Sequence, residues 1–142
     1  MDRVLLVDDD VNLLSGLSRH LRRYFDVSTA IGGQAALDAV GQSVEANLPF
    51  TVVLCDMRMP GMDGIETLKA IRNISPDTVR LMLTGNADQQ TAIDAINQGS
   101  IFRFYTKPCP ADVLVDGLNA GIEQYRLITA ERDLLEKTLA GS

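Results

Sequence analysis

The chain has 142 residues, of which 46% are hydrophobic and 23% are charged, and its formal net charge is −6. This length and composition are typical of one folded domain with its own core. A net negative charge argues against the surface of clustered Lys and Arg that nucleic acids need, so we expect no nucleic-acid partner. No apolar run reaches 18 residues and the N-terminus has no signal-peptide pattern, which predicts a cytoplasmic protein without a membrane span.

Short apolar runs alternate with segments of helical periodicity along the chain. In order, the expected strands are Val4–Val7, Val27–Ala30, Thr51–Cys55, Val79–Leu83 and Ile101–Tyr105. The expected helices are Val11–Tyr24, Gln34–Val44 (with Ala35, Leu37, Val40 and Val44 as its apolar positions), Asp63–Ile74, Asp88–Gln98 and a last one from Pro110 onward. Strands that are apolar on both faces predict a parallel sheet covered by helices on both sides. With right-handed crossovers, this is a doubly wound α/β sheet of five strands.

Polar residues and one glycine follow four of these strands at their carboxyl ends. They are Asp8, Asp9 and Asp10 after the first strand, Asp56 after the third, Thr84 and Gly85 after the fourth, and Lys107 after the fifth. Each alone is commonly a turn or cap residue, and Asp10 is expected to be the N-cap of the helix that begins at Val11. Open α/β sheets bind ligands at the carboxyl ends of their strands, so the coincidence predicts a site there.

The chemistry of this predicted site is that of phosphoryl transfer. Carboxylates that crowd together raise one another's pKa unless a cation lies among them. Oxygen ligands of this kind suit Mg²⁺, which takes one or two carboxylates and keeps several waters. A divalent cation, a lysine and a hydroxyl can neutralise and orient a phosphoryl group while a free carboxylate attacks it in line.

Four motifs, VLLVDDD, LCDMRMPGMDG, LMLTGNAD and FYTKP, resemble those of the receiver domain of two-component response regulators, in the same order and at comparable spacing. They span residues 4–108, and the resemblance extends to about residue 125. It implies a CheY-like, flavodoxin-like (βα)₅ fold with strand order 2-1-3-4-5. It also implies a phosphoacceptor signalling domain at 1–125 rather than an enzyme, which receives a phosphoryl group from a sensor histidine kinase or phosphotransfer protein.

The resemblance assigns the acidic residues their roles. Asp56 would be the phosphoacceptor. Asp9 would bind Mg²⁺ directly, Asp8 largely through water, and Asp56 and the backbone carbonyl of Arg58 would complete the protein ligands. The side chains of Arg58 and Asn86 would flank the path of the attacking water and so tune dephosphorylation.

It also assigns the residues that hold and sense the phosphoryl group. Lys107 would pair with that group, the Thr84 hydroxyl and the Gly85 N–H would donate hydrogen bonds to it, and the Lys107–Pro108 peptide bond would be cis. In the switch, Thr84 moves toward the phosphoryl group and Phe104 turns inward to fill the space. The family often has Tyr at the position of Phe104, so a signal carried by a phenol hydroxyl is not expected.

The last helix is longer than this fold requires. Its heptad positions are Leu114, Leu118, Gly121, Tyr125, Ile128, Arg132, Leu135 and Leu139, of which six are apolar. We expect 126–142 to extend this helix, either as a homodimer contact or as a signalling helix, although a surface helix with an apolar stripe has the same pattern. QYRLITAERDLLEKTLAGS resembles the linker that precedes HD-type cyclic-dinucleotide phosphodiesterase domains, so we expect a linked output domain, HD-type among the possibilities.

Two other readings fit parts of the pattern. In a haloacid-dehalogenase-type phosphohydrolase, Asp8 would be the nucleophile of an Asp-x-Asp-x-Thr/Val motif that the run from Asp8 to Asn12 half fits. Asn12 then stands at the Thr/Val position, and Asp56 with its MRMPGMDG segment has no role. The other reading is a receiver-like fold that binds partners without being phosphorylated, which leaves the full set of site residues unexplained.

Overall fold

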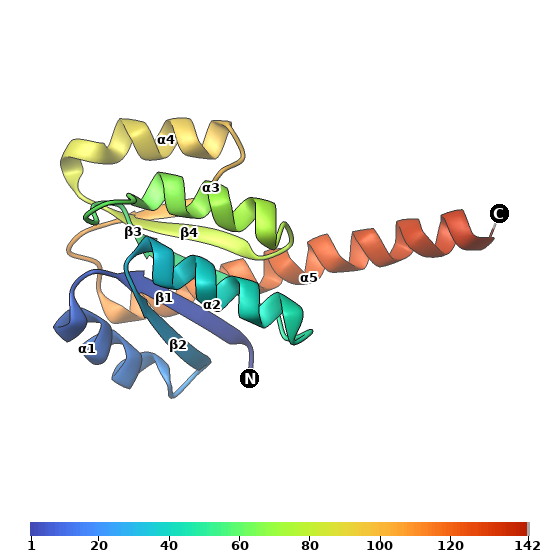
Figure 1. The fold of residues 1–142 in the computed structure, drawn as a ribbon, viewed down its shortest axis with the longest axis horizontal. Helices are drawn as coiled ribbons and strands as arrows, with labels where there is room; N and C mark the ends of the chain where they lie inside the picture. The colour runs from blue at the N-terminus through green and yellow to red at the C-terminus, as the bar shows by residue number, and fades with distance from the viewer. Residues whose placement is uncertain (142) are drawn as a thin grey trace.

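Five parallel strands form the central sheet in the computed structural model, which describes residues 1–141 (Figure 1). In chain order they are β1 (Arg3–Asp8), β2 (Asp26–Ile31), β3 (Val52–Asp56), β4 (Val79–Thr84) and β5 (Arg103–Thr106). Across the sheet they run β2-β1-β3-β4-β5, and every neighbouring pair is parallel. The predicted doubly wound fold and its strand order are confirmed.

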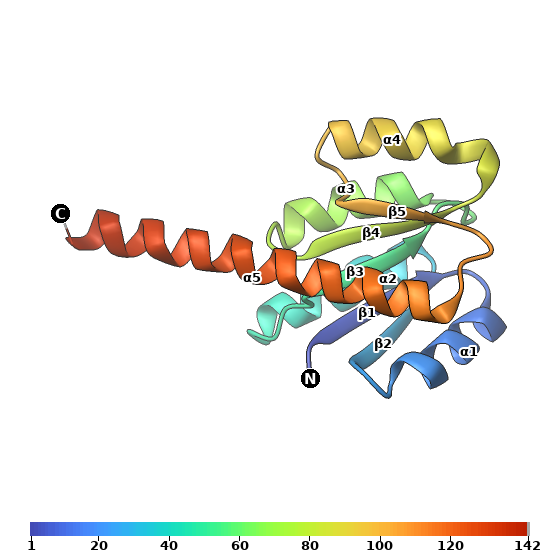
Figure 2. The same ribbon diagram turned by 180° about the vertical axis from the view of Figure 1, so that it is seen from behind.

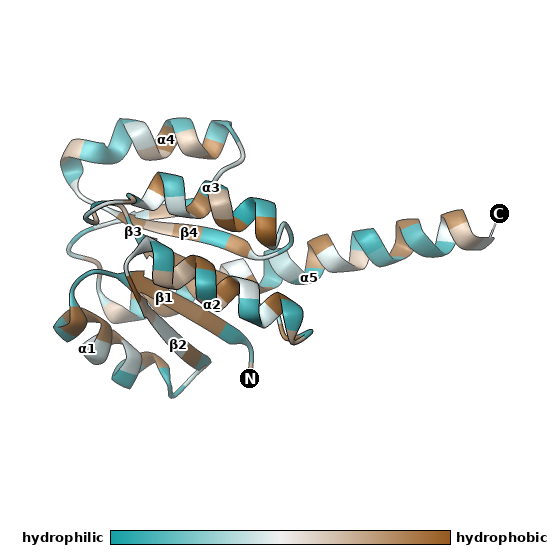
Figure 3. Cartoon of the chain, in the orientation of Figure 1, coloured by the Kyte–Doolittle hydropathy of each residue, from teal (hydrophilic) through white to brown (hydrophobic). Residues whose placement is uncertain are grey.

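Helices cover both faces of the sheet. One face is covered by α1 (Val11–Leu21) and the first half of α5 (Ala111–Gly141), and the other by α2 (Gly33–Glu45), α3 (Gly64–Ile74) and α4 (Gln89–Asn97) (Figures 1 and 2). A short 3₁₀ turn, η1 (Asn86–Asp88), precedes α4. Side chains alternate between the faces along a strand: Leu5 and Val7 of β1 pack toward α2 and α3, whereas Val4 and Leu6 pack toward α1 and α5. The middle of β1 (Val4–Val7) and most of β3 are therefore apolar on both faces, as the colouring in Figure 3 shows for β1, whereas the edge strands β2 and β5 carry polar and exposed residues.

Carboxylates fix the starts of two helices beside the sheet edge. The Asp10 side chain accepts hydrogen bonds from the backbone N–H groups of Asn12 and Leu13, at 3.0 and 3.1 Å, so Asp10 is the predicted N-cap of α1. Asp63 caps α3 in a reciprocal capping box with Glu66. These caps set where each helix leaves the loop that follows its strand.

The structure corrects three details of the predicted elements. The helix α1 ends at Leu21 rather than Tyr24, and β5 begins at Arg103 rather than Ile101. Ile101 instead belongs to the turn after α4, where its N–H donates to the Ala95 carbonyl. In α2, Ala35 is exposed and Val44 is 38% exposed, because the face toward the sheet carries Ala36 and Val40.

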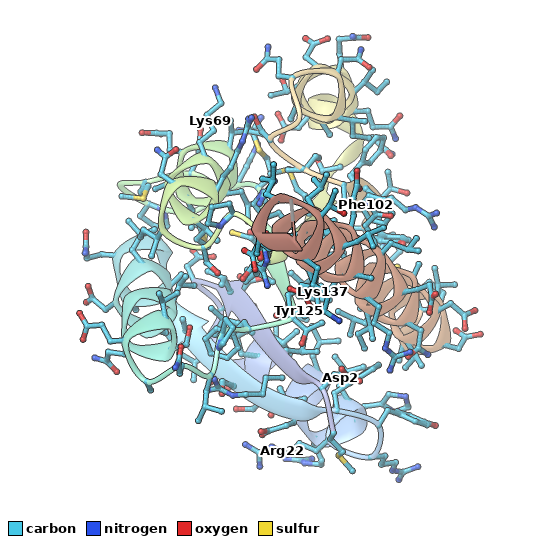
Figure 4. All side chains as sticks on the ribbon, turned by 90° about the vertical axis from the view of Figure 1, so that its right-hand side faces the viewer. Asp2, Arg22, Lys69, Phe102, Tyr125 and Lys137 are labelled. Atoms are coloured by element: carbon cyan, nitrogen blue, oxygen red, sulfur yellow. The ribbon has the colours of Figure 1, made fainter. Side chains whose placement is uncertain are left out.

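The helix α5 has two different halves. Leu114, Leu118 and Ile122 are buried against the sheet, whereas Leu135 and Leu139 are 57% and 76% exposed. Its 31 residues span about 46 Å, and the second half projects beyond the sheet (Figures 1 and 2), toward the viewer in Figure 4. An Arg132–Asp77 ion pair fastens the helix near the point where it leaves the body.

The predicted helical extension therefore forms, and Ser142, the last residue of 126–142, lies outside the described residues. Across residues 1–141, no helix combines the length and the apolarity that crossing a membrane would require.

Candidate functional site

Three carboxylates meet at the carboxyl ends of β1 and β3. Asp8 and Asp56 are both 4% exposed, and Asp9 is exposed beside them. One carboxylate oxygen from each lies within 4.8 Å of the others. The register explains the proximity, because β1 and β3 are paired neighbours with Val7 opposite Cys55.

The electrostatics of this cluster show an excess of negative charge. Burial, reinforced by the charge of Asp56, raises the pKa of Asp8 from 3.8 to about 6, although the Asp8 carboxylate accepts a hydrogen bond of 3.0 Å from the Asp10 N–H. Lys107 opposes the rise, but its single charge does not offset it. A further cation among these carboxylates would therefore be stabilising.

Lys107 reaches this cluster from the end of β5. Its Nζ forms an ion pair with Oδ1 of Asp56. The Lys107 N–H donates to the Thr84 carbonyl at 2.9 Å, and the Lys107–Pro108 peptide bond is cis, as the resemblance implies. The lysine thus contacts Asp56 directly, rather than Asp8, among the buried carboxylates of the site.

Thr84 ends β4 next to the cluster, and its side chain is fully buried. The Thr84 hydroxyl donates to the carbonyl of Gly85 at 3.2 Å. The sequence predicts that this hydroxyl donates to a phosphoryl oxygen. To do so it would have to give up the observed hydrogen bond to the Gly85 carbonyl. Gly85 is partly exposed at the same edge of the sheet.

Phe104 lies on β5 opposite Met82 of β4. It is partly buried and packs against the core on the side of α2, α3 and α4. Its neighbour Tyr105 packs on the other face, where a Cβ at Gly117 of α5 would meet the phenol ring. Two adjacent aromatic residues of one edge strand thus contact opposite layers.

The loop after Asp56 is folded tightly against it. The Gly64 N–H donates to the Met57 carbonyl at 2.8 Å. A Cβ at Gly64 would collide with the carbonyl oxygen of Asp56, so only glycine fits there. Gly61 has a φ of +78°, which also favours glycine. The two glycines of the MRMPGMDG segment are therefore explained by a turn at Gly61 and by the close approach of Gly64 to the backbone of Asp56.

Arg58 has a partner that sequence reasoning missed. Its Nε and Nη2 donate to Oδ2 and Oδ1 of Asp88, at 2.7 and 2.9 Å. The two residues are 30 positions apart, and opposite charges in two strand-end loops are the one sequence signal that points to them. Asn86, predicted to flank the site with Arg58, accepts a hydrogen bond from Gln89 at 3.2 Å.

The donor set of the site fits Mg²⁺. The ligand atoms offered by Asp8, Asp9 and Asp56 are carboxylate oxygens, two of the three groups are buried, and one is open to solvent. Magnesium prefers such oxygen ligands and retains several waters on its exposed side. The raised pKa of Asp8 indicates the same need for positive charge.

Comparison with known sequences identifies a family for this arrangement. Residues 4–119 match the family model of the response regulator receiver domain. The hydrogenase transcriptional regulatory protein HoxA of Cupriavidus necator is 33% identical over 120 residues, which are 84% of this chain and 24% of HoxA. The chain therefore spans about a quarter of the length of that relative.

Comparison with solved structures agrees. A crystal structure described as adenylate cyclase from Rhodopirellula baltica is 48% identical, with a TM-score of 0.92, over 96% of this chain and 98% of that chain. The signal receiver domain of an HD domain-containing protein from Pseudomonas fluorescens is 28% identical, with a TM-score of 0.76, over 93% and 92% of the two chains. Both likenesses extend over nearly the whole of the chain.

Proposed function

Since the chain belongs to the response regulator receiver family and acts in phosphorelay signalling, we propose that Asp56 is its phosphoacceptor. The observation that carries the proposal is the ion pair between Lys107 and Asp56 beside the carboxylates of Asp8 and Asp9. A buried carboxylate with a lysine at one oxygen and a candidate cation site at its side is arranged to attack a phosphoryl group.

In the proposed step, a carboxylate oxygen of Asp56 attacks the phosphorus of a phosphohistidine in a histidine kinase or phosphotransfer protein. The P–N bond breaks, its electron pair remains on the imidazole nitrogen, and that nitrogen takes a proton. Lys107 neutralises one phosphoryl oxygen, while the Thr84 hydroxyl and the Gly85 N–H donate to others. Bound Mg²⁺, held by Asp8, Asp9, Asp56 and the Arg58 carbonyl, would supply the remaining positive charge.

The proposed switch follows from the observed hydrogen bond of Thr84. Its hydroxyl donates to the Gly85 carbonyl, so it leaves that acceptor when it turns to the phosphoryl group. Phe104, partly buried on the neighbouring strand, would then turn into the space that Thr84 vacates. The change would pass to β5 and α5, the elements next to it in the fold.

Labelling with radioactive acetyl phosphate and Mg²⁺ tests the proposal. We expect one label per chain, loss of the label in Asp56→Asn, and a wild-type label in the control Asp94→Asn, which removes an exposed carboxylate of α4. A label that survives Asp56→Asn but is lost in Asp8→Asn would instead support the phosphohydrolase with Asp8 as nucleophile. The Lys107–Asp56 pair argues against that outcome.

We propose that residues 1–125 form the receiver unit and that 126–142 carry its signal outward. The exposed Leu135 and Leu139 continue the heptad spacing of the buried Leu114 and Leu118, which supports pairing with a second copy of the chain. Light scattering should then show a dimer, and Leu135→Glu with Leu139→Glu should shift it to a monomer. A monomeric wild type, with and without beryllofluoride, would contradict the pairing.

We also propose that α5 leads into an attached output domain that makes or breaks a cyclic nucleotide. The linker sequence and the receiver of the Pseudomonas fluorescens HD domain-containing protein favour an HD-type domain, and the Rhodopirellula baltica likeness favours a cyclase. The full-length protein should change its activity toward ATP or a cyclic dinucleotide when Mg²⁺ and beryllofluoride are added. Activity toward neither would contradict this part of the proposal.

A further inference from the structure

The ion pair between Arg58 and Asp88 connects the two loops that border the phosphoacceptor site. We propose that Asp88 is a positioning residue which, by holding Arg58, keeps Thr84 and Gly85 in the unphosphorylated arrangement and so opposes the switch. This inference rests on the proposed function above and concerns its regulation. The reasons are the geometry of the pair and the hydrogen bonds that lead from it to Thr84.

The geometry of the pair is specific. Two N–H groups of the Arg58 guanidinium donate to the two oxygens of Asp88, at 2.7 and 2.9 Å. Such a two-point contact fixes direction as well as distance, which a single contact does not. The Asp88 side chain is 13% exposed although the Arg58 side chain is 76% exposed, so the carboxylate is the more enclosed partner. These hydrogen bonds also hold the pKa of Asp88 below its ordinary value.

The sequence positions of the pair place it across the site. Arg58 follows the proposed phosphoacceptor Asp56 by two residues, in the loop after β3. Asp88 follows Thr84 by four residues, at the end of η1. The ion pair therefore ties the loop that follows the acceptor to the segment that begins with Thr84.

A continuous set of hydrogen bonds leads from Asp88 to Thr84. The Asp88 N–H donates to the Gly85 carbonyl at 3.1 Å. The Thr84 hydroxyl donates to the same carbonyl at 3.2 Å. The Gly85 carbonyl oxygen thus accepts two hydrogen bonds. One comes from the N–H of Asp88, which Arg58 anchors, and the other from the Thr84 hydroxyl, which the phosphoryl group would need. Restraining Asp88 favours the arrangement in which Thr84 is turned away.

Beryllofluoride with Mg²⁺, a mimic of the phosphoryl group, provides the measurement. The full chain is titrated as wild type, Arg58→Gln, Asp88→Asn and the double variant, with Asp94→Asn as a control that removes a carboxylate from α4. Because an ion pair near the surface is weak, we expect each single variant to bind the mimic about 2- to 5-fold more tightly. The double variant should equal a single one, since the same pair is lost in each.

A reversed pair separates positioning from a general effect of charge. Arg58→Asp combined with Asp88→Arg should return the affinity for the mimic toward the wild-type value, whereas each change alone should not. Single effects that add in the double variant, or an Asp94→Asn effect as large as that of Asp88→Asn, would overturn the inference. So would an unchanged affinity in Asp88→Asn.

Failure of the proposed function is recognised separately. If Asp56 is not the phosphoacceptor, the acetyl phosphate label persists in Asp56→Asn with the ion pair intact. If only the role of the Arg58–Asp88 pair is wrong, the label still depends on Asp56 in every variant. The affinities for beryllofluoride then do not show the expected coupling, in which the double variant equals a single one. The two outcomes are read from the same set of proteins.

Discussion

The two sides of the site are packed differently. On the side of Asp56, the proposed acceptor, every residue of β3 is buried, and this strand is enclosed by helices on both faces. On the other side, β5 has one exposed and three partly buried residues, and it lies at the edge of the sheet. The side that holds the carboxylates is therefore firmly packed, while the side that carries Lys107 and the proposed switch residue Phe104 has fewer packed contacts to break.

Two glycines give this comparison its sharpest test. In Gly64→Ala the new Cβ meets the backbone of Asp56 and Met57, whereas in Gly117→Ala it meets the ring of Tyr105. Backbone in a buried strand cannot move aside, so Gly64→Ala should lower the free energy of unfolding by about 1–3 kcal/mol and slow labelling of Asp56. Gly117→Ala should stay within about 1 kcal/mol of wild type, because the partly buried ring can shift and alanine favours the helix.

Urea denaturation and the rate of labelling, measured on both variants, decide the matter. Equal losses of stability would mean that the β5 side is as tightly packed as the β3 side, and the comparison would fail. A normal labelling rate in Gly64→Ala would show that the position of Asp56 tolerates displacement.

The next largest effect concerns the cation on the anchored side. Mg²⁺ at ten times its dissociation constant should stabilise the protein by about 1.4 kcal/mol. At about 2–4 °C per kcal/mol, the melting temperature should rise by about 3–6 °C. Asp9→Asn should reduce this rise strongly because it removes an open ligand of the cluster. Asp10→Asn should leave it unchanged, because Asp10 caps α1 and asparagine is an equally good cap.

Thermal melts with and without Mg²⁺ measure both variants. Equal loss of the Mg²⁺ effect in Asp9→Asn and Asp10→Asn would contradict the assignment of Asp9 to the cation site and of Asp10 to the N-cap of α1. Ca²⁺ in place of Mg²⁺ serves as a further comparison, since a site that retains waters distinguishes the two ions.

A third expected effect is that of pH on the metal-free protein. The pKa of Asp8, raised to about 6, means that the folded state binds a proton between about pH 4 and pH 6 that the unfolded state does not. The contribution of Asp8 to the free energy of unfolding therefore falls as pH rises through this window. Relative to wild type, Asp8→Asn should gain melting temperature as pH rises from about 4 to neutral. Parallel pH profiles of the two proteins would count against the raised pKa.

Much of the fold could be predicted because its signals are local. The central strands β1 and β3 are apolar on both faces, and helix starts such as Asp10 have side chains that cap them. Parallel strands bring their ends to one edge, so the proximity of Asp8, Asp9 and Asp56 also follows from the order of elements.

The features that could not be predicted depend on tertiary contacts. The Arg58–Asp88 pair joins residues 30 positions apart, and no spacing rule connects them. The direction of the Thr84 hydroxyl depends on which acceptor is nearest in the folded chain. The sequence predicts the wrong inward position at Ala35 of α2, because small residues on both sides of this helix make its apolar periodicity ambiguous.

The continuity of α5 has a consequence for anything joined to it. Residues 122–140 contain neither Gly nor Pro, so nothing in this stretch is expected to kink the helix between its buried and exposed halves. Such a helix transmits angle as well as position, because each residue advances the chain by about 100° around the axis. Inserting one residue in the exposed half would leave the site intact but rotate every later residue by about 100° around the helix axis. A seven-residue insertion would nearly restore the original orientation.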